Sequence, residues 1–360
     1  MPSGNLLIIL ALAICFAALL FSSFQGEVET GSYVTGLVLK LIVRDVYPTI
    51  DNQTAGLAKV RGAMNGRQNS IVSADPKIMD VTIVTSADKN MLLRIYLQKG
   101  GELDQYTIRD TPQTKKLSPV LIWFHGGGFV VGNFSNDDSQ CNRIVKHTDF
   151  VVVSVDYRLA PEDKFPAAIL DAVDALQWTK QSIQEYGGDP NLVYLSGESA
   201  GGTIATALTA VTLDPAWTNP ATATNIEGLF LAYPCLDHGV YLDSHFRYSN
   251  SFALLTLKQM QYFWSLYLND QAIDSLDYRA CPMRTPDNIL KNFPKTYIIL
   301  AKNDILLDEG LKFSERLKSV NVSVETTVYN DMYHGFFAMG AGGKVKDVEI
   351  YRNLQALTIQ

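Results

Sequence analysis

The segment GESAGG at residues 197–202 contains a serine in the pattern G-x-S-x-G. The strand-like run NLVYLS at 191–196 precedes it, and a stretch with helical character follows. A serine on a tight strand-to-helix turn is held with its hydroxyl exposed, and Gly197 and Gly201 are needed because side chains there would collide with neighbouring backbone. The pattern predicts Ser199 as a nucleophile, and the alternative is a serine that only caps the helix.

A second glycine cluster, HGGGF at 125–129, follows the apolar run VLIWF at 120–124. Backbone without Cβ atoms can approach a bound carbonyl group closely, with its N–H groups pointing at the carbonyl oxygen. Two or three such donors form an oxyanion hole, each contributing roughly 3 kcal/mol to transition-state stabilisation. We expect the N–H groups of Gly127, Gly128 and Ala200 to be these donors. The alternative is a merely flexible glycine turn.

A serine hydroxyl is a weak nucleophile, so a base must take its proton and an acidic side chain must orient that base. Among the five histidines, His334 in MYHGFF follows a predicted strand and lies on a loop, which favours it as the base. His125 belongs to the glycine cluster. His147, His238 and His245 lie in polar segments, where solvated or capping histidines are expected. The alternative for His334 is a buried structural histidine.

The acidic partner is expected directly after the predicted strand TYIILA at 296–301, where Asp304 emerges. Asp308 is the competitor, but it falls one helical turn later, where an acidic residue suits the first turn of the following helix. We therefore favour Asp304. The resulting chain order, Ser199, Asp304, His334, is that of α/β-hydrolases and differs from the order in trypsin-type and subtilisin-type enzymes.

The elements that must position these residues follow from hydrophobic patterning. Strands are expected at 80–85, 92–97, 120–124, 150–157, 191–196, 228–234, 296–301 and 323–329, the first two as an antiparallel pair. Helices are expected at 166–186, 200–213, 308–319 and 344–358. This alternation predicts an α/β fold with a mostly parallel eight-stranded sheet and helices on both faces.

Two segments do not fit the alternation, 31–75 and about 236–290, and the second is rich in aromatic residues. We interpret both as parts of a helical lid over the carboxyl edge of the sheet, where open α/β sheets bind ligands. The chain then divides into an apolar segment at 1–24, an N-terminal lid segment at 25–79 and a catalytic domain at 80–360 that carries the lid insertion.

The N-terminal segment contains sixteen consecutive apolar residues, LLIILALAICFAALLF at 6–21, with no lysine or arginine before them. Such a run is close to the lower limit of about 17 residues for a spanning helix, and it also resembles the apolar region of a signal peptide. Phe24 and Gln25 make a poor cleavage site, so an uncleaved signal-anchor is favoured over a cleaved signal. A buried helix is the third interpretation.

The residues after this run give an expected orientation. Glu27 and Glu29 follow it, so the bulk of the protein is expected on the lumenal or extracellular side. Glycosylation sequons at Asn52, Asn133 and Asn321 agree with a secretory route. We expect an endoplasmic reticulum membrane protein with a lumenal catalytic domain rather than a secreted one.

The composition argues against other classes of protein. The net charge of -7 arises from 37 acidic and 30 basic residues without blocks of like charge, which disfavours nucleic acid as a partner. Outside the apolar run the cysteines are Cys141, Cys235 and Cys281, and their spacing suggests no metal or redox site. The expected partner is a small apolar molecule, with no cofactor and no metal.

Six motifs occur in a fixed order: HGGGF, VDYRLAPE, FPAA, GESAGG, DILLDE and HGF. With them the chain resembles the hormone-sensitive-lipase-like family of α/β-hydrolases over about residues 80–340, and the motifs look nearest to its arylacetamide deacetylase branch. The resemblance implies a carboxylic ester hydrolase with a lid. The deacetylase branch implies an N-terminal signal-anchor and a lumenal catalytic domain.

Some positions depart from the usual family pattern: Ile305 replaces a frequent proline, Asp163-Lys164 replaces a common His-Pro or Asn-Pro, and Glu198 lies in the nucleophile motif. Glu198 stands where GDSAG is commoner, and GESAGG also occurs in cholinesterase-like carboxylesterases, in which a glutamate far upstream of the histidine is the acid. Here Asp304 lies 30 residues before His334, which favours the lipase-like family. In YRLAPE, Arg158 and Glu162 are interpreted as structural.

The expected reaction is ester cleavage through an acyl-enzyme, and Phe129, Phe336 and Phe337 are expected to line an apolar acyl or aryl pocket, unless they are ordinary core residues. An amidase or deacetylase would use the same triad. A non-catalytic ligand receptor on the same fold is a further alternative, which the three filled triad positions disfavour.

Overall fold

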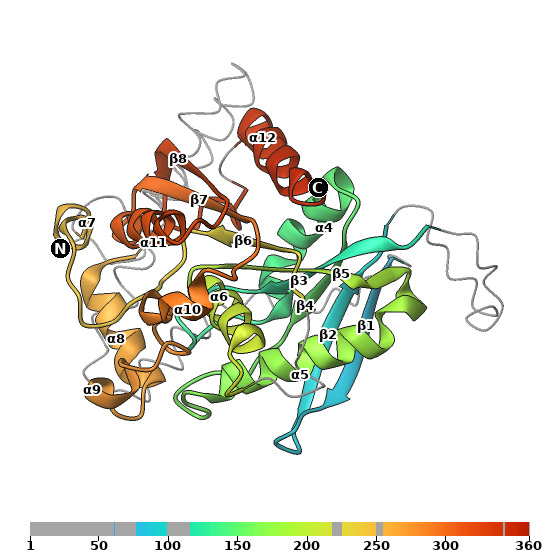
Figure 1. Ribbon diagram of the computed structural model, residues 1–360, viewed down its shortest axis with the longest axis horizontal. Helices are drawn as coiled ribbons and strands as arrows, with labels where there is room; N and C mark the ends of the chain where they lie inside the picture. The colour runs from blue at the N-terminus through green and yellow to red at the C-terminus, as the bar shows by residue number, and fades with distance from the viewer. Residues whose placement is uncertain are drawn as a thin grey trace, which may run out of the picture.

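The computed structural model describes residue 61 and residues 77–98, 116–217, 225–249, 255–340 and 343–359. Its centre is an eight-stranded sheet in the order β1-β2-β4-β3-β5-β6-β7-β8 (Figure 1). The strands are β1 (Ile78–Val84), β2 (Asn90–Tyr96), β3 (Ser118–Phe124), β4 (Val151–Val155), β5 (Gly188–Glu198), β6 (Gly228–Ala232), β7 (Thr296–Asn303) and β8 (Val324–Tyr333). Only the pairs β1–β2 and β2–β4 are antiparallel. The predicted fold class is confirmed.

Helices cover both faces of the sheet. They are α4 (Asp138–His147), α5 (Ala167–Ser182), α6 (Ala200–Leu213), α7 (Asp243–Arg247), α8 (Leu257–Tyr267), α9 (Gln271–Asp274), α10 (Asp287–Leu290), α11 (Leu307–Ser319) and α12 (Gly343–Ala356), with short 3-10 turns η2 (Phe134–Asp137), η3 (Ile183–Tyr186) and η4 (Pro282–Arg284). α4 and α12 pack into one core and α5, α6 and α11 into the other. Successive residues of β3 alternate between these cores, as expected for a strand buried on both faces.

Each predicted strand and helix is present, with changes mainly at the ends. The helix expected at 166–186 divides into α5 and η3. The insertion at 236–290 consists of the short helices α7 to α10, which gather at the left of Figure 1. The apolar segment 1–24 and all of 25–76 except Arg61 lie outside the described residues. Among the helices of the described part of the chain, none is long and apolar enough to cross a bilayer.

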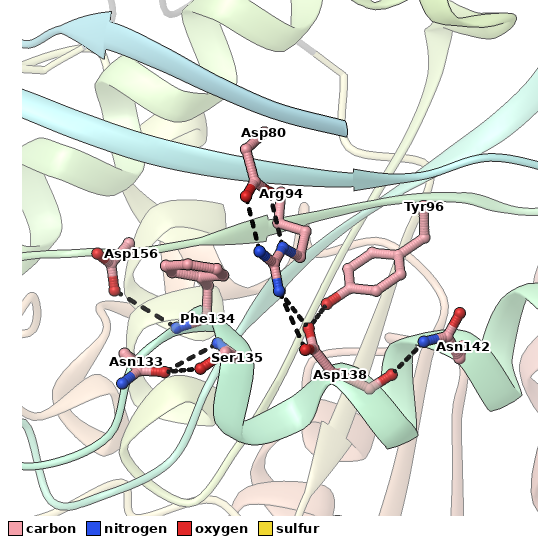
Figure 2. A network of polar contacts seen from close by, with 9 residues as sticks. All are labelled: Asp80, Arg94, Tyr96, Asn133, Phe134, Ser135, Asp138, Asn142 and Asp156. Atoms are coloured by element: carbon pink, nitrogen blue, oxygen red, sulfur yellow. Dashed lines mark hydrogen bonds and ion pairs between the residues drawn. The ribbon is translucent and has the colours of Figure 1, made fainter. Parts of the chain in front are cut away.

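An arginine connects the antiparallel edge of the sheet to α4 (Figure 2). Arg94 on β2 donates to both oxygens of Asp80 on β1 at 2.6 Å and to both oxygens of Asp138, the first residue of α4, at 3.0 Å. Tyr96 also donates to Asp138, and the guanidinium lies 4.4 Å above the ring of Phe134. The Arg94 side chain is only 5% exposed. Paired, planar hydrogen bonds of this kind are the strong ones.

The segment between the glycine cluster and α4 is fixed by the same part of the fold. Asn133 accepts a hydrogen bond from the N–H of Ser135 at 2.9 Å and caps η2. The N–H of Phe134 donates to Asp156, the residue after β4. Figure 2 shows these contacts beside the Arg94 ion pairs. The chain leaving the glycine cluster is therefore anchored to β2 and β4.

We expect Arg94→Leu to lower the free energy of unfolding by about 3 kcal/mol, because it leaves two carboxylates without their buried partner. Asp80→Asn is the matched control: it keeps the pairs to Asp138 and should cost about 1 kcal/mol or less. Urea denaturation of both variants would measure the difference. Equal losses in the two variants would contradict a central role for Arg94.

Candidate active site

Ser199 lies on the turn between β5 and α6, with φ 52° and ψ −121°. A non-glycine residue in such a conformation carries about 1–3 kcal/mol of strain, which the surroundings must hold. Its N–H donates to the carbonyl of Ala232 at 3.0 Å. A Cβ on Gly201 would lie 2.0 Å from the carbonyl oxygen of Phe124, and one on Gly197 would lie 2.3 Å from the carbonyl of Gly201. Both glycines are therefore required, as the motif predicts.

The three residues predicted as a triad lie together. His334 Nε2 is 3.0 Å from Ser199 Oγ, and His334 Nδ1 is 2.8 Å from Asp304 Oδ2. Asp304 is fully buried, and its other oxygen accepts the N–H of Leu306 at 2.9 Å. Asp304 directly follows β7 and His334 directly follows β8, and these strands are parallel neighbours. Parallel pairing thus brings the two loops to one edge of the sheet.

The competing acid, Asp308, lies elsewhere: it accepts the N–H of Ser244 in the lid at 2.8 Å. Its neighbour Glu309 is buried and interacts at 2.9 Å with His245 Nε2. His245 Nδ1 accepts the N–H of Leu242, so Nε2 carries the proton donated to Glu309. Of the two expected roles, solvated or capping, His245 has the second: it caps α7 and is fully buried. This pair fastens the insertion at 236–290 to α11.

The glycine cluster forms a tight turn beside Ser199. Gly127 and Gly128 have φ of 115° and 62°, and the carbonyl of Gly127 accepts the N–H groups of Val130 and Val131. A Cβ on Gly127 would lie 2.0 Å from the carbonyl oxygen of Val131. Within the described residues no hydrogen bond is found for the N–H of Gly127, Gly128 or Ala200, and all three residues line one cavity with Ser199. These N–H groups are available to a developing oxyanion.

The cavity in front of Ser199 and His334 has a volume of about 220 Å³. Its apolar wall is formed by Val131, Leu255, Met260, Phe263, Trp264 and Met339. Three of these residues come from α8, in the aromatic-rich insertion at 236–290. Apolar walls with a few convergent polar groups are typical of small-molecule sites.

Of the three phenylalanines expected in the pocket, the structure brings only Phe129 there. Phe129 lines the cavity and stacks on Tyr267 at a ring distance of 3.8 Å. Phe336 and Phe337 are buried and do not line it; the ring of Phe337 lies 5.5 Å from that of Phe230 in the core under α4 and α12. Phe336 and Phe337 are therefore ordinary core residues, the alternative named above, because the chain turns into the core after His334.

Sequence analysis missed a buried polar link behind the nucleophile. Glu198 accepts a hydrogen bond from the Tyr233 hydroxyl at 2.5 Å and another from the N–H of Gly126. The Tyr233 oxygen in turn accepts the N–H of Ala338, on the loop that carries His334. Burial raises the pKa of Glu198 well above its usual range, which favours the neutral acid. In the sequence, the departure from GDSAG at Glu198 could have indicated this link, whereas no motif marks Tyr233.

His125 supports the glycine cluster and takes no part in proton transfer. Burial lowers its pKa to about 4, so the ring stays neutral. It stacks on Tyr157 at 4.2 Å, and the Tyr157 hydroxyl donates to the His125 carbonyl at 2.8 Å. Arg158 is structural as expected, donating to buried Asp171 at 2.8 Å.

Comparisons with known proteins agree with this arrangement. A sequence model of the alpha/beta hydrolase fold matches residues 121–338. The chain is 30% identical over 249 residues to the carboxylic ester hydrolase LipN of Mycobacterium tuberculosis, covering 68% of this chain and 65% of LipN. It is 29% identical to mouse arylacetamide deacetylase, covering 72% of this chain and 75% of that enzyme.

A comparison with solved structures also finds an esterase. The hyperthermophilic esterase from Pyrobaculum calidifontis aligns with a TM-score of 0.73 and 26% identity over 91% of this chain and 98% of the esterase. The matched family region contains all three triad residues and the glycine cluster. Motif order, fold and matched region therefore agree, and the chain belongs to the hormone-sensitive-lipase-like family of α/β-hydrolases.

Proposed function

We propose that the protein is a serine hydrolase that cleaves carboxylic esters of small to medium apolar acyl or aryl groups. The observation that carries the proposal is the hydrogen-bonded series Asp304, His334, Ser199, with distances of 2.8 and 3.0 Å, opening on an apolar cavity. A nucleophile, a base and a residue that orients the base, in that geometry, are the requirements for acyl transfer.

In the proposed mechanism His334 Nε2 takes the proton of Ser199 as the hydroxyl oxygen attacks the ester carbonyl. Asp304 holds the Nδ1–H tautomer and stabilises the imidazolium. The N–H groups of Gly127 and Gly128, with that of Ala200, bind the oxyanion. His334 then protonates the departing alkoxide, and water, activated by the same histidine, releases the acyl group from Ser199.

The walls of the cavity support a neutral substrate. No lysine, arginine or aspartate is among its lining residues in the described part of the chain, and the neutral form of Glu198 is favoured. A charged substrate would lose its hydration there without a partner. LipN is a carboxylic ester hydrolase and the Pyrobaculum enzyme is an esterase, and the similarity to both supports the same substrate class.

Arylacetamide deacetylation is the second candidate function. It is favoured by the similarity to mouse arylacetamide deacetylase, which extends over 72% of this chain. The same three residues would serve, with His334 protonating an amine in place of an alkoxide.

For location, we propose that the apolar run at 6–21 anchors the protein in the endoplasmic reticulum membrane with the catalytic domain in the lumen. The run itself and the exposed sequon at Asn321, on the turn between α11 and β8, support this. Asn133 is only 7% exposed and its side chain caps η2, so a glycan is not expected there.

We expect Ser199→Ala to lower kcat on p-nitrophenyl acetate, p-nitrophenyl butyrate and p-nitroacetanilide by about 10⁴-fold or more, since the nucleophile is lost. Labelling by a fluorophosphonate probe should disappear as well. Ser196→Ala is the control, because Ser196 is buried in β5 and its hydroxyl has no hydrogen-bond partner among the described residues. Undiminished turnover in Ser199→Ala would refute the proposal, and the wild-type ratio of ester to anilide rates separates the two candidate functions.

A second pair of variants distinguishes the two acids. Asp304→Asn should lower kcat by about 10⁴-fold, because His334 would lose the group that holds its tautomer. Asp308→Asn should stay close to wild type. Among the described residues the Asp308 carboxylate accepts only the N–H of Ser244, and the backbone N–H of Asp308, which donates to the Ser244 hydroxyl, is kept. Steady-state kinetics on p-nitrophenyl butyrate would measure both. The reverse pattern would show that Asp308 is the acid.

The proposed location predicts one glycan at Asn321. When the full chain is expressed with microsomes, Asn321→Gln should remove one endoglycosidase-sensitive increment in mass, and Ser323→Ala should do the same by destroying the sequon. The protein should remain in the membrane pellet after carbonate extraction. A mass unchanged by either substitution, together with release by carbonate, would exclude the lumenal, anchored arrangement.

A further inference from the structure

Arg61, in the segment before the sheet, reaches the loop that carries the proposed oxyanion donors. Its Nε donates to the carbonyl of Val130 at 2.9 Å, and one terminal nitrogen donates to the carbonyl of Ala160 at 2.8 Å. Both terminal nitrogens also bond to Glu162, at 2.6 and 2.8 Å. All three nitrogens of the guanidinium are therefore engaged, and the side chain is 24% exposed.

Two of these acceptors belong to a contact between the glycine turn and the loop after β4. The N–H of Ala160 donates to the carbonyl of Phe129 at 2.9 Å, and the N–H of Val130 donates to Gly127. Arg61 donates to one carbonyl in each of these two loop segments, that of Val130 and that of Ala160. It therefore bridges the two segments and fixes the Val130 peptide relative to Gly127.

The glycine turn needs such external support. Gly127 and Gly128 lack side chains that could hold their left-handed conformation. On the cavity side the ring of Phe263 packs against Gly128, where an added Cβ would lie 2.5 Å from it. Arg61 adds a second contact, at the carbonyl of Val130. Donors aimed at an oxyanion act only when they are held in place before the reaction.

The ion pair with Glu162 does not explain why Arg61 lies there. The Glu162 side chain is 58% exposed, and exposed ion pairs contribute about 0–1 kcal/mol. A charged donor to partly buried carbonyls forms stronger bonds. The hydrogen bonds to the carbonyls of Val130 and Ala160 are thus the contacts through which Arg61 stabilises the glycine turn.

We propose that Arg61 is a positioning residue for the oxyanion loop, residues 126–131, acting through the Val130 peptide on the N–H groups of Gly127 and Gly128. Arg61 is not among the residues that line the cavity in the described part of the chain, and it lies outside the matched family region at 121–338. The inference rests on the proposed esterase function, because it concerns the rate of that reaction.

The test compares Arg61→Ala, Arg61→Lys and Glu162→Ala in the full chain. Arg61→Ala should lower kcat on p-nitrophenyl butyrate about tenfold with little change in KM, because transition-state donors are misplaced while ground-state binding is kept. Glu162→Ala, which keeps both bonds to carbonyls, should stay near wild type. The kcat of Arg61→Lys should lie between those of the other two variants, since a single ammonium group replaces the planar guanidinium with its several donors. Thermal unfolding checks that all variants are folded.

A second measurement does not depend on activity. Hydrogen exchange at the amides of Val130 and Val131 should accelerate in Arg61→Ala and stay unchanged in Glu162→Ala. Equal exchange in wild type and Arg61→Ala overturns the inference, as does accelerated exchange without a fall in kcat. A wild type that turns over no ester refutes the proposed function instead, and the exchange rates then decide whether Arg61 holds the loop.

Discussion

The close approach of Gly201 to the end of β3 is the contact on which the site depends. The carbonyl oxygen of Phe124 lies where a side chain at 201 would start, so the turn that carries Ser199 can rest directly against the strand that delivers the glycine cluster. β3 and β5 are parallel neighbours with Phe124 opposite Gly197. Their register thus sets the distance between nucleophile and proposed oxyanion donors, and the buried sheet supports the strained conformation of Ser199.

Three buried carboxyl groups connect the segments that form the site. Asp304 orients His334, Glu309 binds His245 of the lid, and Glu198 receives the Tyr233 hydroxyl. A buried carboxyl group is costly unless its oxygens are hydrogen-bonded. Each group therefore constrains the element that satisfies it. These hydrogen bonds fix the relative positions of the turn at Ser199, the loop at His334 and the insertion at 236–290. The cavity between them is nevertheless mainly apolar.

The triad could be predicted because its signals are local. Ser199 has glycines at fixed offsets, and Asp304 and His334 each follow a β-rich run, so strand-end geometry brings them together. Phe336 and Phe337 could not be placed, because both faces of the sheet are buried and a run of phenylalanines fits the core or the pocket equally well. The direction in which the chain turns after His334 is set by distant packing, which periodicity does not contain.

The same reasoning explains why Arg61 carried no signal in the sequence. Its partners lie 69 to 101 residues away, and a single arginine in an unpatterned segment has no motif to mark it. Yet the glycine turn is the part of the site that its own residues determine least, since freedom of the backbone is what the chemistry requires of it. Its geometry must therefore come from contacts with neighbouring residues, which are Ala160, Phe263 and Arg61. The proposed role of Arg61 therefore places a determinant of the rate outside the motifs that carry the glycine turn, Ser199, Asp304 and His334.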